Sequence, residues 1–71
     1  MEIEKHGDRA GHLFAILTDQ FEQASAVATK GQNQALSVSS RVALVGELES
    51  AVRSIERTIV LLNRVLSKAR R

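Results

Sequence analysis

Residues 45–69, VGELESAVRSIERTIVLLNRVLSKA, carry apolar side chains at alternating steps of three and four. One apolar line has a period of seven, starts before this stretch, and contains Val38, Val45, Val52, Ile59 and Leu66. A neighbouring line with the same period contains Leu48, Ile55, Leu62 and Ala69. Two adjacent lines of this kind form the heptad seam of a long helix that packs against other helices.

The composition favours packed helices and leaves few ways to stabilise a short chain. The 71 residues include no Pro, no Cys and only two aromatic side chains. A chain of this length buries about 60% of its unfolded surface, so its core is small. The lack of Cys excludes disulfides and thiolate metal sites, and the two His residues are too few for structural zinc. We therefore expect oligomerisation or a protein partner to complete the core.

A first helix is predicted over about residues 8–30. Asp8 is a suitable N-cap, and Gly31 is a suitable C′ residue just beyond the last turn. The apolar positions of this segment recur with helical spacing, and we expect them all to share the core-facing side. They are Ala10, Leu13, Phe14, Leu17, Phe21, Ala24 and Ala28.

The start of the second helix is open between two alternatives. The Ser-rich residues 31–41 have weak helix propensity and favour an elbow, followed by a helix over about residues 42–70. Asn33 is also a suitable cap, and it would start the same helix near residue 34. In either case the chain forms one helical domain over residues 1–71.

The lengths of the two helices predict an uncovered end. The first helix is about 33 Å long, whereas a helix from residue 34 to residue 70 reaches about 55 Å. Folded back at Gly31, the first helix covers about residues 34–54, or about residues 42–60 if the second helix starts near residue 41. Both alternatives leave the end of the second helix bare, and we expect residues 55–69 to lack a partner in their own chain. We expect a protein interface there, formed by Val52, Ile55, Ile59, Leu62, Val65 and Leu66.

The expected fold is therefore all-α, an antiparallel helical hairpin with a long, heptad-patterned C-terminal helix that oligomerisation or a partner completes. A competing arrangement is a closed three-helix bundle. In that bundle residues 31–46 form a short middle helix, and residues 47–70 pack along the first helix.

A stripe of basic residues lies opposite the seam and is a candidate anion-binding surface. It contains Arg53, Arg57, Arg64, Lys68 and Arg71. Such a stripe can follow nucleic-acid phosphates or anionic lipid headgroups, or it can simply be the solvated outer face of a bundle. Nucleic acid is the less favoured partner, because the stripe has no aromatic side chain for stacking and the chain has no helix-turn-helix pattern.

Catalysis is not expected, because no nucleophile motif, phosphate-binding loop or metal-ligand spacing occurs. His6 and His12 are six residues apart and do not share a helix face, so we assign no catalytic residue, cofactor or metal. The longest apolar run, residues 59–62, is far below the roughly 20 residues that span a bilayer. The polar N-terminus lacks the apolar core of a signal peptide. We expect a cytoplasmic protein without a transmembrane segment.

The expected function is that of a non-enzymatic protein interaction module, such as a small chaperone, adaptor or assembly subunit, acting through the apolar helix seam. One alternative is a nucleic-acid or regulatory binding protein that uses the basic stripe, and another is a small inhibitor that coats a larger protein. In size and two-helix layout the chain resembles the small helical co-chaperones and filament subunits of type III secretion systems. That resemblance of shape implies a helical assembly role.

Overall fold

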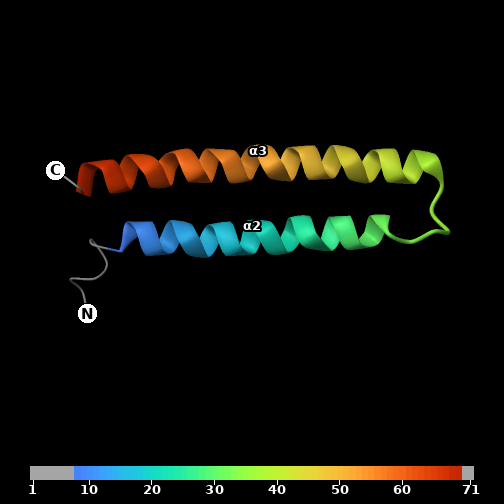
Figure 1. The fold of residues 1–71 in the computed structure, drawn as a ribbon, viewed down its shortest axis with the longest axis horizontal. Coiled ribbons are helices and arrows are strands. Elements are labelled where there is room, and N and C mark those ends of the chain that lie inside the picture. Colours follow the sequence, from blue (N-terminus) through green and yellow to red (C-terminus); the bar gives the residue numbers. More distant parts are fainter. Residues whose placement is uncertain (1–7, 70–71) are drawn as a thin grey trace.

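Two antiparallel helices make up the fold of residues 8–69, the part of the chain that this computed structural model describes (Figure 1). Helix α2 spans Arg9–Gly31 and helix α3 spans Val38–Ala69; they pack side by side and are joined by residues 32–37. The predicted all-α helical hairpin is confirmed. Because α3 is one continuous helix, the closed three-helix bundle is wrong.

The two ends of α2 differ from the predicted caps. Asp8 occupies the N-cap position, but its side chain makes no capping hydrogen bond. Gly31 is the last helical residue and has no positive φ, so its predicted role as the C′ residue beyond the helix is wrong. Gln32 is the C-cap instead, and its backbone N–H donates to the carbonyl oxygen of Thr29 at 3.1 Å.

Ser37 starts α3. Its side-chain Oγ accepts a hydrogen bond from the backbone N–H of Ser40 at 3.1 Å, and its carbonyl oxygen accepts one from the N–H of Arg41 at 3.1 Å. These are the bonds of a serine N-cap followed by the first helical turn. The helix therefore begins at Val38, between the two predicted starts.

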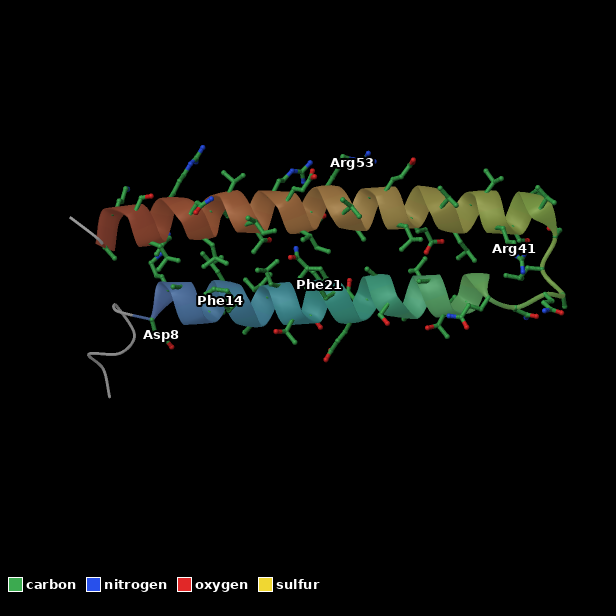
Figure 2. All side chains as sticks on the ribbon, in the orientation of Figure 1. Asp8, Phe14, Phe21, Arg41 and Arg53 are labelled. Atoms are coloured by element: carbon green, nitrogen blue, oxygen red, sulfur yellow. The ribbon has the colours of Figure 1, made fainter. Side chains whose placement is uncertain are left out.

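The connection between the helices is held by its own hydrogen bonds. Oδ1 of Asn33 accepts from the N–H of Ala35 at 2.9 Å, so Asn33 stabilises a turn and does not cap a helix. The guanidinium of Arg41 donates through Nη2 to the carbonyl oxygen of Asn33 at 2.9 Å, beside the connection in Figure 2. Arg41 thus ties the connection to the first turn of α3.

One hydrogen bond and one close approach indicate the register of the hairpin. Nε2 of Gln20 donates to the carbonyl oxygen of Ser54 at 3.5 Å, and a Cβ at Gly31 would lie 3.8 Å from Cδ1 of Leu44. Counting outward from these contacts, we find that α2 covers about residues 44–66 of α3.

The prediction that residues 55–69 lack cover in their own chain is therefore wrong. The longer uncovered part of α3 is at its opposite end, over residues 38–43. The reason is the connection, residues 32–37, which continues past the end of α2 before α3 turns back (Figure 1). The predicted pairings, over about residues 34–54 or 42–60, both ended before the last turns of the second helix that α2 in fact covers.

The core is a narrow line between the helices. Leu17, Ile55 and Leu62 are its buried apolar side chains, with 5% to 8% of their surface exposed, and Thr58 is buried beside them. The buried and half-buried positions of each helix recur at alternating steps of three and four, and we call this row of positions the core line of the helix. On α2 they are Ala10, Leu13, Leu17, Gln20, Ala24, Val27 and Gly31. On α3 the core line contains Leu44, Leu48, Ala51, Ile55, Thr58, Leu62 and Val65, and Ser54 beside Ile55 is half-buried as well.

Phe14 and Phe21 are not in this core. They are 53% and 54% exposed, so their predicted role as core residues is wrong. Each lies one position beyond the core line of α2, where Leu13, Leu17 and Gln20 face α3 instead.

Candidate interaction surface

The two lines of the heptad seam lie in different surroundings in the structure. The line through Leu48, Ile55 and Leu62 packs against α2, whereas the line from Val38 to Leu66 remains exposed along its whole length. The same exposed heptad position on α2 also carries apolar side chains. We call this combined surface the apolar face; it contains Phe14, Phe21 and Ala28 of α2 and Val38, Val45, Val52, Ile59 and Leu66 of α3.

Helix geometry places both halves of the apolar face on one side of the hairpin. Successive residues of an α-helix are about 100° apart around the helix axis. Phe14 and Phe21 therefore lie about 60° and 40° around the axis of α2 from Leu17, both in the sense in which the helix winds from N- to C-terminus. Val52 and Ile59 are turned by the same angles from Ile55. When two antiparallel helices face each other, equal rotations of this kind lead to the same side. The apolar face is therefore one broad side of a two-helix layer.

The register of the hairpin places side chains of α2 and α3 at matching heights on the apolar face, and we call each such height a level. The Gln20–Ser54 contact places Phe21 at the height of Val52. Phe14 then lies at the height of Ile59, and Ala28 at the height of Val45, each one heptad away. A heptad rises about 10 Å, so these levels repeat evenly along the hairpin.

The structure divides the six predicted interface residues into two groups. Val52, Ile59 and Leu66 are exposed on the apolar face. Ile55 and Leu62 are buried against α2, and Val65 is half-buried on the same core line, so the reason for placing these three at an interface is gone. Sequence reasoning missed the phenylalanines of α2; their seven-residue spacing, equal to that of the exposed α3 line, is the signal that points to them.

The borders of the apolar face differ between the helices. Along α2 the next positions outward are Gly11, Thr18 and Ser25, which carry no charge. Along α3 the corresponding positions include Glu49 and Glu56. The face thus has a neutral border on α2 and an acidic border on α3.

The opposite broad side is mixed in character. Ile16 and Leu61 are exposed there, but the same heptad positions also carry Arg9, Lys30 and Glu47. Charged and apolar side chains alternate on this side, so the continuous apolar surface belongs to the other side.

The basic stripe lies on the outer edge of α3. Arg53, Arg57 and Arg64 line one shallow groove together with Glu56, Val60 and Leu61. Figure 2 shows Arg53 on the edge that faces away from α2. Lys68 is exposed but does not line this groove, and Arg71 lies outside the described residues. Three of the five predicted anion-binding residues are thus brought together.

The described part of the chain offers little else for ligand chemistry. Within residues 8–69 no three His, Cys, Asp or Glu side chains gather in a way that would hold a metal ion. His6 lies outside that range. Neither α2 nor α3 is long and apolar enough to cross a membrane. No family model matches the chain, and no curated protein or solved structure is significantly similar to it.

Proposed function

We propose that this protein is a non-enzymatic protein interaction module that binds through the apolar face. The observation that carries the proposal is the exposure of Phe14, Phe21, Val52 and Ile59, at 43% to 54%, on one side of the hairpin. A continuous apolar surface of this kind on a small helical protein marks a binding surface. A chaperone, adaptor or assembly subunit would use it in the same way.

The energetics favour covering this face. Full burial of a Val, Leu, Ile or Phe side chain is worth about 1.5–3 kcal/mol, and these side chains are roughly half exposed. Covering each of them therefore contributes on the order of 1 kcal/mol. The seven large side chains of the apolar face are together enough to offset much of the entropy lost on association. The thin core, with three buried apolar side chains among the described residues, makes that contribution important for the hairpin itself.

The charges around the apolar face favour a protein over a membrane surface. Peripheral helices that bind anionic lipid carry Lys and Arg beside their apolar side. Here the border on α3 carries Glu49 and Glu56, which anionic headgroups repel. The basic residues Arg53, Arg57 and Arg64 lie on the outer edge instead.

Two valines of α3 provide a matched test. Val52 on the apolar face and Val60 on the outer edge are both 48% exposed, so Val52→Asp and Val60→Asp differ mainly in the side of the helix that they change. We expect Val52→Asp to abolish self-association or partner binding in co-purification and sedimentation, and Val60→Asp to retain both. Equal behaviour of the two variants would contradict the proposal.

A second candidate function is anion binding by the groove of Arg53, Arg57 and Arg64. Phosphate binding through these side chains would weaken steeply with salt, whereas apolar docking would change little. Arg57→Ala combined with Arg64→Ala should then abolish binding to an anionic polymer such as heparin. An unchanged, salt-insensitive interaction would exclude this candidate.

A further inference from the structure

We propose that the apolar face is covered by a second copy of this chain. The two hairpins pack about a two-fold axis parallel to their length, so that each α2 lies on α3 of the partner subunit in a four-helix bundle. This inference rests on the proposed function and names the partner. Three properties of the face support it: its area, its pattern of side chains and the charges at its borders.

The area is sufficient for a stable dimer. The hairpin is a single layer of helices; its two-helix part is about 35 Å long, the length of the 23-residue α2, and 22 Å wide, so each broad side has a projected area of about 770 Å². Two such sides bury about 1,500 Å², which lies within the roughly 1,200–2,000 Å² of a standard stable interface. A second layer also gives the hairpin the two-layer architecture that small domains use to cover apolar faces.

The side-chain pattern suits packing against itself. A two-fold interface brings the same surface of both copies together, so the surface must complement itself. The two-fold axis parallel to the hairpins places Phe21 opposite Val52 of the partner subunit, because these two residues share a level. It places Phe14 opposite Ile59 of the partner subunit for the same reason. Every large aromatic ring thus meets a smaller aliphatic side chain, which keeps the spacing between the layers even.

The charges at the borders select this two-fold axis. A two-fold axis across the hairpin would place α3 on α3 and bring the acidic borders, Glu49 and Glu56, of both copies together. The lengthwise axis instead places these acids beside the neutral border of α2, which contains Gly11 and Thr18. Like charges are thereby kept apart.

The outer edges are also complementary in this arrangement. The outer side of α2 carries Asp19 and Glu22, whereas the outer edge of α3 carries Arg53, Arg57 and Arg64. The lengthwise axis places the acidic edge of one copy along the basic edge of the other. Opposite charges at the rim speed association and fix its orientation.

The test combines oligomeric state with one distance in the full chain. Sedimentation equilibrium should give twice the chain mass for the unmodified protein and for Ile16→Asp, a change on the opposite broad side. Val52→Asp and Phe21→Ser should sediment as single chains that circular dichroism still reports as helical. A spin label on Gln34→Cys, the single thiol of that variant, reports the relative direction of the two hairpins, since Gln34 is exposed in the connection.

Each result has a defined meaning. The lengthwise axis places both connections at the same end, so the label-to-label distance should be far below the 51 Å length of the hairpin. A distance near or above that length would overturn this arrangement. A single chain at all concentrations would overturn self-association, but the proposed function would stand if another protein binds Ile16→Asp and not Val52→Asp. A dimer that persists in Val52→Asp and in Phe21→Ser would overturn the proposed dimer and the proposed function together.

Discussion

Gln20 of α2 donates a hydrogen bond from its side-chain Nε2 to the backbone carbonyl oxygen of Ser54 on α3, across 3.5 Å. The other amide atom, Oε1, is buried and has no hydrogen-bond partner. A buried acceptor without a partner costs on the order of 1–3 kcal/mol. A polar residue in an apolar seam commonly specifies register at the expense of stability, and Gln20 occupies such a position.

Replacing Gln20 should therefore stabilise the hairpin. We expect Gln20→Leu to raise the free energy of unfolding by about 1 kcal/mol, because it removes the unpaired oxygen and adds apolar surface to the core. Urea denaturation at a fixed protein concentration measures this change. Gln23→Leu is the matched control, since Gln23 is exposed, and it should change stability by less than about 0.5 kcal/mol. A loss of stability in Gln20→Leu would show that the bond to Ser54 outweighs the unpaired oxygen.

Ile59 and Leu62 should respond differently to the same change. Leu62 is 5% exposed in the core, so Leu62→Asp buries a charge without a partner and should unfold the hairpin. Ile59 is 43% exposed on the apolar face, so Ile59→Asp should retain most of the helix signal in circular dichroism while association is lost. Comparable helix content in the two variants would contradict the assignment of Leu62 to the core.

Ser37 should contribute to the start of α3. Ser37→Ala removes the oxygen that accepts from the N–H of Ser40, and the loss of an N-cap of this kind costs about 1 kcal/mol. Thermal or urea denaturation measures the change. Ser39→Ala serves as the control, because the Ser39 hydroxyl bonds only the Ser37 hydroxyl among the described contacts. Equal effects of the two substitutions would argue against the cap.

Gly46 should be replaceable by Ala with a gain in stability. It is exposed within α3, and a Cβ there would meet nothing within 4 Å. Ala is more favourable than Gly inside a helix by about 0.8–1.0 kcal/mol. We expect Gly46→Ala to raise the unfolding free energy by up to about 1 kcal/mol without changing the oligomeric state. A destabilised variant would indicate that a binding partner or a second copy approaches α3 closely at this position.

Much of the secondary structure follows from local chemistry in the sequence. The heptad spacing from Val45 to Ala69 and the absence of Pro predict a long helix, and α3 has that character. The apolar spacing after Asp8 predicts a first helix, and α2 spans Arg9–Gly31. These features depend on periodicity and propensity within one helix, which is why a single sequence is sufficient to predict them.

The candidate site was only half predictable. Val52, Ile59 and Leu66 follow from the seam, but Phe14 and Phe21 were expected in the core. Large aromatic side chains are normally buried, so composition alone assigns them to the interior. The structure buries a line of smaller side chains instead.

The periodicity of the sequence is enough to predict two helices and two adjacent apolar lines on the second one. It does not predict which line is covered, because the lines are about 40–60° apart around the helix and similarly apolar. The choice depends on the facing helix. Ala10, Ala24 and Gly31 on the core line of α2 allow α3 to approach closely, whereas Phe14 and Phe21 on that line would hold the helices apart. The rotation that buries Leu17, Ile55 and Leu62 is therefore the one that leaves the apolar face exposed.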